Sequence, residues 1–319
     1  MLAAKVYDAL VVGGGPAGLS AALALARVSR TALVFDTNEF RSAGAQAMHT
    51  VLSRDGTNPA EFRKIARHQL ETDYTTVDFN DKAAIEVEKI TLEPGHAGFQ
   101  VRDAADAIFQ GRKLVLATGS EDVLPVDLPG YKENWPRNIY QCLFCDGLER
   151  AGKPVGILTF PIAMYLHFAV MAKHFGGPVT IFTNGVKERA EDVDAALQKA
   201  LKLGITIEER PIRELIGEEG GVTVHFQDGS QQEVAYLVHK PPTKNRGQAL
   251  IDQLGLEVMQ PSGEVVTKPP FGESSVPGCF VAGDTAGFLK QVAIAMGEGV
   301  RAGSGVSFQL CSETVASLD

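Results

Sequence analysis

Two cysteines in the middle of the chain have the spacing of a redox pair. Cys142 and Cys145 are separated by two residues, and Asp146 follows directly. Two thiols at this spacing can exchange two electrons as a dithiol/disulfide pair. A zinc site would need a second such pair, but Cys279 and Cys311 lie far apart in the sequence, so no metal site is expected and both are interpreted as buried core residues. Two structural cysteines remain the alternative for the motif itself.

Thiol chemistry at neutral pH is helped by a base, because a thiol with a pKa of about 8.5 is mostly protonated there. Asp146 is the nearest candidate, and His239 is the second. Each also has a structural interpretation. Asp146 fits a helix start, where the helix dipole stabilises a carboxylate. His239 stands just before Pro241 and Pro242 and fits a solvent-exposed loop.

A glycine-rich turn near the start of the chain predicts a dinucleotide site. Gly13 allows a tight turn, Gly15 lets the backbone approach a pyrophosphate, and Gly18 lets helix and strand pack closely. The phosphates would lie on free N–H groups at the helix N-terminus. Asp36, about 20 residues further on, can accept hydrogen bonds from a ribose. The surrounding predictions are a strand at 7–12, the turn residues Pro16 and Ala17, a helix at 19–28 and a strand at 31–35.

Composition narrows the class of protein. The chain has 319 residues, which suggests about two domains, and 45% hydrophobic residues with a mean hydropathy near zero describe a globular chain. A net charge of −9 argues against nucleic-acid binding. Four cysteines do not make a secreted disulfide scaffold, and neither a signal peptide nor an apolar stretch of membrane-spanning length is recognised. We therefore expect a cytoplasmic protein that binds no membrane.

Two further segments resemble patterns of flavoprotein disulfide reductases with two dinucleotide domains. An apolar strand at 113–117 ends in Ala117 and is followed by Thr118 and Gly119. Another, at 279–282, is followed by Gly283 and Asp284. In that family the aspartate holds the ribityl chain of FAD. The resemblance implies an FAD-binding domain at 1–121 and 245–319, interrupted by a domain at 122–244 that carries the cysteine pair. Proline-rich joints at 124–130 and 239–244 fit this division.

Together the motifs resemble the low-molecular-weight thioredoxin reductases over nearly the whole chain. The resemblance implies an α/β protein with two Rossmann-like three-layer domains, FAD as cofactor and a homodimer. It also implies further flavin contacts from the segment after the second strand and from the start of the last helix. These residues are Arg41, Gln46, His49, Lys290, Gln291 and Val292.

The middle domain departs from that family at its NADPH site. A strand at 153–158 is followed by Thr159, Phe160, Pro161 and Ile162, where the family has a glycine-rich turn. Proline also removes one N–H. The next strand, 179–182, ends in 183–185 without the histidine and arginines that grip a 2′-phosphate in the family. We interpret Phe160, Met164, Tyr165 and Phe168 as core residues, and 187–192 as a solvated helix start.

The chain is most similar in detail to the fungal dithiol oxidases of the gliotoxin type, on the stretches 139–145, 48–50, 54–56 and 238–240. That resemblance implies an FAD-dependent oxidase that closes the disulfide of an epidithiodiketopiperazine-type dithiol, with O2 as acceptor and H2O2 as product, in biosynthesis or self-resistance. Cys142 would face the substrate and Cys145 the flavin. The alternatives are a thioredoxin reductase-like enzyme fed by a non-NADPH donor such as ferredoxin, and a flavoprotein that binds a metabolite without turnover.

Overall fold

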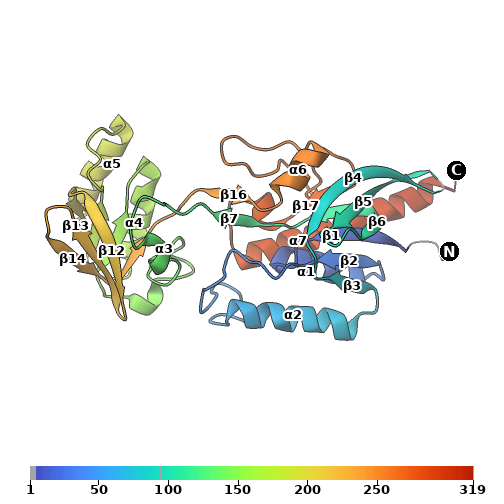
Figure 1. Cartoon of the computed structure of the whole chain (residues 1–319), viewed down its shortest axis with the longest axis horizontal. Coiled ribbons are helices and arrows are strands. Elements are labelled where there is room, and N and C mark those ends of the chain that lie inside the picture. Colours follow the sequence, from blue (N-terminus) through green and yellow to red (C-terminus); the bar gives the residue numbers. More distant parts are fainter. Residues whose placement is uncertain (1–4, 94, 319) are drawn as a thin grey trace. The chain divides into compact units, whose positions relative to one another are not determined.

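The computed structural model describes residues 5–93 and 95–318. Contacts divide the chain into two compact units (Figure 1). The first comprises Met1–Ala43, Val51–Asp122 and Thr243–Asp319, and the second comprises Gly44–Thr50 and Val123–Pro242. The segment 44–50, which the sequence analysis placed with the flavin-binding part, is thus grouped with the middle unit.

The first unit is built on a seven-stranded sheet in the order β3-β2-β1-β6-β5-β4, with β17 beside the carboxyl half of β6. Strands β3, β2, β1, β6 and β17 are parallel, whereas β4, β5 and β6 form an antiparallel meander. The strands are β1 (Val6–Val12), β2 (Ala32–Phe35), β3 (Val77–Asn80), β4 (Ala84–Leu92), β5 (His96–Asp103), β6 (Ile108–Leu116) and β17 (Cys279–Val281). A two-stranded ribbon, β7 (Ser120–Asp122) with β16 (Thr243–Asn245), stands where the chain leaves and re-enters this unit.

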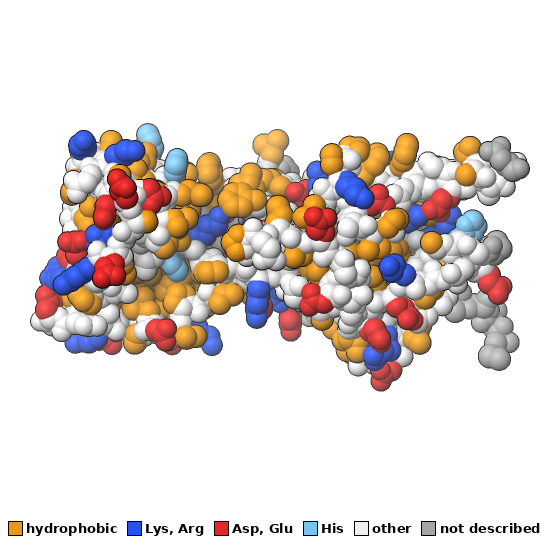
Figure 2. Space-filling model, turned by 90° about the horizontal axis from the view of Figure 1, so that it is seen from above, with side chains coloured by type: hydrophobic (Ala, Val, Ile, Leu, Met, Phe, Trp, Pro, Cys, Tyr) orange, Lys and Arg blue, Asp and Glu red, His pale blue; other side chains and the backbone are white. Residues whose placement is uncertain are grey.

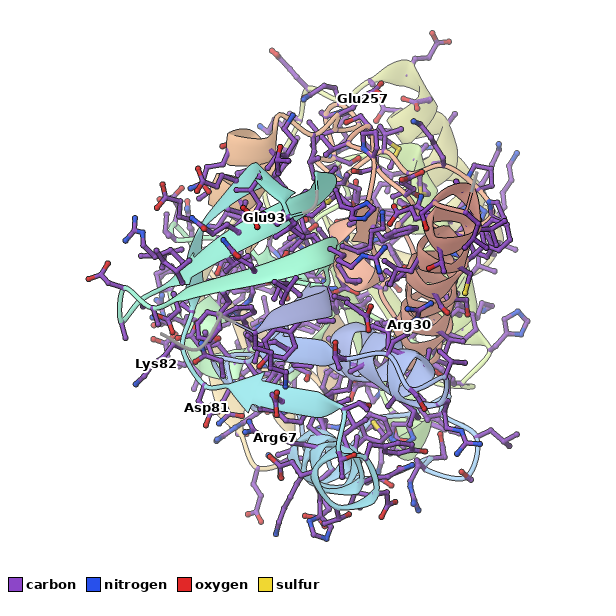
Figure 3. All side chains as sticks on the ribbon, turned by 90° about the vertical axis from the view of Figure 1, so that its right-hand side faces the viewer. Arg30, Arg67, Asp81, Lys82, Glu93 and Glu257 are labelled. Carbon is purple, nitrogen blue, oxygen red and sulfur yellow. A yellow bond between two sulfur atoms is a disulfide. The ribbon has the colours of Figure 1, made fainter. Side chains whose placement is uncertain are left out.

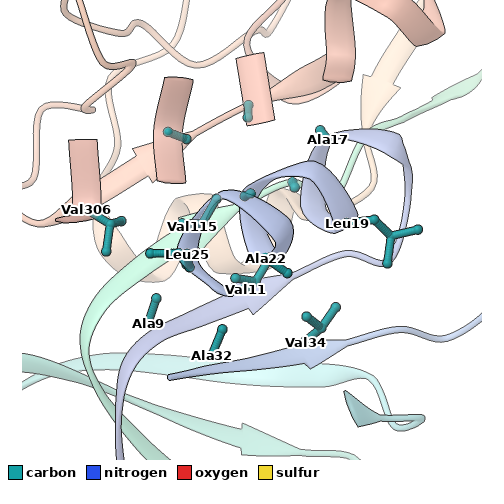
Figure 4. Close-up of a cluster of buried hydrophobic side chains, with 14 of the residues drawn as sticks. Ala9, Val11, Ala17, Leu19, Ala22, Leu25, Ala32, Val34, Val115 and Val306 are labelled. Atoms are coloured by element: carbon teal, nitrogen blue, oxygen red, sulfur yellow. The ribbon is translucent and has the colours of Figure 1, made fainter. Parts of the chain in front are cut away.

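Helices cover both faces of this sheet. They are α1 (Pro16–Ala26), α2 (Pro59–Asp73), α6 (Gln248–Leu254) and α7 (Val292–Ala316), with the short η3 (Gly283–Thr285). Small residues let α1 and α7 pack closely: a Cβ at Gly299 would lie 2.0 Å from the carbonyl oxygen of Ala17. Figure 4 shows the resulting core, in which Val11 and Val115 of the sheet meet Leu25 of α1 and Val306 of α7.

The second unit has a five-stranded parallel sheet in the order β11-β10-β9-β15-β8 and an antiparallel sheet β12-β13-β14. Its strands are β8 (Ile139–Tyr140), β9 (Val155–Leu158), β10 (Val179–Phe182), β11 (Thr206–Glu208), β12 (Ile212–Glu218), β13 (Gly221–Phe226), β14 (Gln231–Val234) and β15 (Tyr236–Val238). Its helices are α3 (Tyr131–Asn134), η1 (Leu148–Arg150), η2 (Ala163–Tyr165), α4 (Leu166–Lys173) and α5 (Glu191–Lys202). The parallel sheet is buried on both faces, as its continuous apolar strands predict.

Three sequence interpretations that concern helices and core residues were wrong. Cys311 is exposed, because its position on α7 turns it away from the buried side that Leu310 occupies; Cys279 is buried as expected. Met164 is exposed, whereas Phe160 and Tyr165 are in the core. Helix α5 begins only at Glu191, so residues 187–190 precede it and do not start it.

Candidate active site

The cysteine pair follows the edge strand β8 of the second unit. Cys142 and Cys145 form a disulfide with Cα atoms 5.2 Å apart. The turn is closed by the backbone N–H groups of Cys145 and Asp146, which donate to the carbonyl oxygen of Cys142 at 3.2 and 3.0 Å. Leu143 anchors the turn in the core, whereas Phe144 is 62% exposed. The structure thus contains the oxidised form of a pair that can accept two electrons.

Asp146 is a half-buried carboxylate beside a cavity of about 1000 Å³. Burial, reinforced by the negative charge of Glu149, raises the pKa of Asp146 to about 6. His49 and Arg150 act in the opposite direction. A carboxyl group that titrates near neutrality can take up and release a proton at physiological pH.

His239 lies at the end of β15, next to the end of β8. Its backbone N–H donates to the carbonyl oxygen of Tyr140 at 2.9 Å. Its Nδ1 lies 2.7 Å from the hydroxyl of Tyr131, a fully buried residue of α3. Burial lowers the pKa of His239 to about 4, so the imidazole is neutral at pH 7. The exposed-loop interpretation of His239 was therefore wrong, because α3 covers the ring.

These two environments favour different roles for the two candidate bases. The pKa of Asp146, about 6, lies near neutral pH, and a pKa near the pH of the reaction is the condition for efficient proton transfer. His239 is too weakly basic to hold a proton at pH 7, but its neutral ring can hold a hydrogen bond. The pKa shifts therefore leave Asp146 as the stronger candidate for a proton carrier, while the ring of His239 is engaged with the Tyr131 hydroxyl.

The carboxyl ends of β1, β6 and β17 meet at one edge of the first sheet and bring three motifs together. They are the glycine turn at 13–18, the segment 117–119 and the pair 283–284. Ligands of parallel α/β sheets bind at this edge. The register pairs Val12 with Leu116, and Leu116 with Val281, so each motif begins at the same level.

The glycine turn has the shape that a pyrophosphate needs. Gly13 has φ +118°, and a Cβ there would lie 2.1 Å from the carbonyl oxygen of Ala117. A Cβ at Gly18 would lie 1.8 Å from the carbonyl oxygen of Gly13. At Gly15, by contrast, a Cβ would meet no described atom within 4 Å, and within the described chain no side chain caps the N-terminus of α1. Open space in front of free N–H groups fits a bound diphosphate.

Asp36 closes β2 beside this turn. Its Oδ1 accepts a hydrogen bond from the backbone N–H of Asn38 at 2.9 Å. The Arg67 guanidinium lies 3.8 Å from Oδ2 of Asp36 and 2.7 Å from Asp81, and Figure 3 labels Arg67 and Asp81 near each other at the surface. A buried carboxylate at this position can accept hydrogen bonds from ribose hydroxyls, as the spacing predicts.

Asp284 is held by two residues of the same unit. Arg41 donates to it at 3.2 Å and forms a 2.6 Å ion pair with Asp122, while the Ser120 hydroxyl donates to Asp284 at 3.2 Å. Lys290, another proposed flavin contact, bonds to Glu264 at 3.0 Å and to the carbonyl oxygens of 284 and 287. Lys290 thus orders the loop before α7, at whose start Gln291 and Val292 stand.

Gln46 and His49 lie in the second unit and line the cavity beside Asp146. Their proposed flavin contacts therefore stay proposals.

Three residues around the site were not found from the sequence: Tyr131, Glu149 and Asp122. Tyr131 and Asp122 are far in sequence from the groups they contact, so spacing gives no signal for them. The acid pair Asp146 and Glu149, three residues apart, is a signal that could have been used.

Comparisons with known proteins agree with this fold. The sequence pattern of the pyridine nucleotide-disulphide oxidoreductase family matches residues 7–299. The thioredoxin reductase sirT of Leptosphaeria maculans is 41% identical, over 98% of this chain and 97% of its own. The thioredoxin reductase aclD of Aspergillus oryzae is 40% identical, over 99% and 100%. The crystal structure of an oxidoreductase from Agrobacterium tumefaciens superposes with a TM-score of 0.86 at 30% identity, over 96% and 99% of the chains.

The fold and the paired motifs define a flavoprotein disulfide oxidoreductase. The chain belongs to the pyridine nucleotide-disulphide oxidoreductase family. Within that family it is a thioredoxin reductase-like protein of the gliotoxin type, and FAD is its cofactor. The predicted α/β class and the predicted cofactor are thereby confirmed. Across the described residues, no helix is both long and apolar enough to span a membrane.

Proposed function

We propose that the protein is an FAD-dependent oxidase that converts a small-molecule dithiol into an intramolecular disulfide, with O2 as acceptor and H2O2 as product. The substrate class is an epidithiodiketopiperazine-type secondary metabolite, and the role is biosynthesis or self-resistance. The observation that carries the proposal is the turn after β9, where a nicotinamide dinucleotide would need to contact the backbone. By resemblance to the family, we also expect a homodimer in the cytoplasm.

Side chains fill that turn. Strand β9 ends at Leu158, and Thr159 follows with φ +64°, a conformation that glycine normally supplies. Phe160 is 6% exposed and packs edge-on against Tyr165, with ring centroids 6.3 Å apart. Pro161 has no N–H to offer a phosphate. The helix N-terminus that would receive the diphosphate is replaced by the short η2 turn, so this half supports a protein that does not bind NADPH.

In the region after β10, where the family binds the 2′-phosphate of NADPH, the positive charge of the chain is neutralised by carboxylates. Arg189 is the first arginine in the sequence after β10, and its side chain is 11% exposed. It donates to Thr183 at 3.2 Å and to Glu209 at 2.8 Å, and Asp194 lies 3.5 Å away. A guanidinium that already faces two carboxylates is a poor partner for a 2′-phosphate. Both halves therefore support a direction of electron flow that does not start from NADPH.

The chemistry can be written through the residues of the chain. One substrate thiolate attacks the sulfur of Cys142, a mixed disulfide forms, and Cys145 leaves as a thiolate. The second substrate thiolate attacks the sulfur that the substrate contributes to the mixed disulfide, so the product disulfide closes and Cys142 leaves. The cysteine pair then holds the two electrons. When bound, FAD supplies the redox chemistry that restores the enzyme disulfide and passes both electrons to O2.

Asp146 carries the protons of this exchange. Its carboxylate takes the proton from an attacking substrate thiol and returns it to a leaving cysteine thiolate, so the exchange is balanced in protons. A pKa of about 6 leaves the group mostly ionised at pH 7 and still able to hold a proton transiently. The neutral imidazole of His239 stays uncharged through the cycle.

The alternative is a thioredoxin reductase-like enzyme, the activity in the names of the similar proteins, with a donor such as ferredoxin in place of NADPH. An acidic electron-transfer protein needs a basic docking face. The net charge of this chain is −9, and acidic and basic side chains are interspersed on the face that Figure 2 shows. Charge therefore favours the small-molecule reading.

The test is a direct reduction of the flavin by a dithiol. The purified holoprotein is mixed anaerobically with small vicinal or transannular dithiols and no NADPH, and flavin absorbance is followed; air is then admitted and peroxide is measured. We expect bleaching by the dithiol and one peroxide per disulfide formed. Bleaching by NADPH, together with no bleaching by any dithiol, would overturn the proposal.

A further inference from the structure

The cavity beside the cysteine pair gathers ionisable groups around Asp146. Asp146, Glu149 and Arg150 come from the turn after the disulfide, and His49 comes from the segment 44–50. The remaining charged residues of the cavity lie on α3, on the following loop and around the end of β12. They are Glu133, Arg137, Glu218 and Glu219. Among the described residues, it is the charges of Glu149, His49 and Arg150 that shift the pKa of Asp146.

Glu149 is fixed at its place by the backbone. Its Oε2 accepts a hydrogen bond from the N–H of Gly147 at 3.2 Å. Gly147 directly follows Asp146 in the sequence, so this hydrogen bond holds the negative charge of Glu149 close to Asp146. Gly147 has φ +124°, and a Cβ there would lie 3.1 Å from Phe175 and 3.2 Å from the Tyr236 hydroxyl. Glycine is therefore required for the turn that presents this N–H to Glu149.

His49 faces the other oxygen of the same carboxylate. Its Nε2 lies 3.4 Å from Oε1 of Glu149, and its side chain is 20% exposed. Arg150, in contrast, is held away from this pair: its guanidinium donates to the carbonyl oxygen of Ala235 and, at 3.4 Å, to Asn138. Arg150 is thus a constant charge, whereas the net charge of the His49–Glu149 pair depends on whether the imidazole carries a proton.

We propose that Glu149 and His49 are positioning residues that set, with opposite sign, how readily Asp146 holds a proton beside the cysteine pair. This inference rests on the proposed dithiol chemistry. A fixed negative charge at Glu149 opposes ionisation of Asp146, and a positive charge at His49 promotes it. The pair keeps Asp146 able to return a proton to a leaving cysteine without Asp146 becoming permanently protonated.

The opposite signs give a sharp experiment. The rate of anaerobic flavin reduction by a small dithiol is measured from pH 5 to pH 8 in the wild type, Glu149→Gln and His49→Gln. The part of the pH–rate profile that depends on Asp146 is identified as the limb that is missing in Asp146→Asn. We expect this limb to move to lower pH by about 0.5–1 unit in Glu149→Gln, because a nearby like charge is lost. In His49→Gln the limb should move to higher pH. Glu233→Gln, an exposed carboxylate of β14 outside the cavity, is the matched control and should leave the limb in place.

A second measurement separates this inference from the proposed function. The cysteine pair of the holoprotein is reduced with a phosphine, and the pH dependence of alkylation by iodoacetamide is followed. If no dithiol bleaches the flavin, the proposed function fails, but opposite shifts of the alkylation profile in the two variants still support the inference. Shifts of the same sign, no shift in either variant, or shifts that persist in the Asp146→Asn background would each overturn it.

Discussion

Replacement of Asp146 by Asn should stabilise the protein at high pH while it slows the reaction. Burial raises the pKa of Asp146 from its ordinary value of 3.8 to about 6. A shift of this size corresponds to at most about 3 kcal/mol, and partial exposure reduces it to about 1–2 kcal/mol. Because the folded-state pKa is raised, the favourable contribution of the protonated carboxyl is complete below about pH 4 and is lost as the pH rises through about 6.

The assay is the thermal unfolding midpoint of wild type and Asp146→Asn as a function of pH. The two midpoints should coincide near pH 4, and the variant should be higher by about 2–6 °C above pH 7. Flavin reduction by a dithiol should fall in the same variant at pH 7. A variant that is less stable than the wild type at pH 8, or one whose advantage is the same at pH 4 and pH 8, would refute the reasoning about burial.

Three further predictions concern the cofactor site, the buried pair and the electron path. Gly15→Ala should fold normally yet bind FAD roughly tenfold or more weakly, because its Cβ enters open space needed by the diphosphate. Gly18→Ala should instead fail to fold, because its Cβ would collide with the carbonyl oxygen of Gly13. Flavin content and the thermal unfolding midpoint distinguish the two variants. Tyr131→Phe should cost about 1–3 kcal/mol in unfolding free energy, measured by urea denaturation, because it leaves the buried Nδ1 of His239 without its hydroxyl. Cys145→Ser should retain FAD but lose dithiol-dependent peroxide formation, and peroxide at the wild-type rate would contradict the proposed path.

The parts of the fold and site that are encoded locally could be predicted from the sequence. The glycine turn, with a strand before it and a helix after it, depends on residues within one short segment. The same holds for the start of α7 after Gln291. Ends of helices were less well predicted, because the contacts that end them are tertiary. Helix α5 shows this: Arg189 is held by Thr183 and Glu209, so the chain stays irregular until Glu191.

The electrostatics of the site could not be predicted in the same way. His239 has an unremarkable sequence context before two prolines, yet α3 brings Tyr131 onto its ring from 108 residues away. That burial removes the ring from solvent and lowers the pKa of His239 to about 4, so the ring is too weakly basic to hold a proton at pH 7. His49 is likewise far in sequence from Glu149, and only the folded chain shows them 3.4 Å apart. Charges act through space, and a linear pattern does not record which loops meet.

The proposed direction of electron flow depends on residues that do not touch the cysteines. A pair like Cys142 and Cys145 can either give or accept two electrons, since thiol–disulfide exchange is reversible. A reductase of this family has a second site, which binds the electron donor NADPH, whereas an oxidase has no use for one. Here Phe160 fills the turn where that site would begin, and Glu209 faces the guanidinium of Arg189. Because the chain keeps the flavin motifs but fills the second site, we propose that electrons enter at the cysteine pair and that a substrate dithiol is their source.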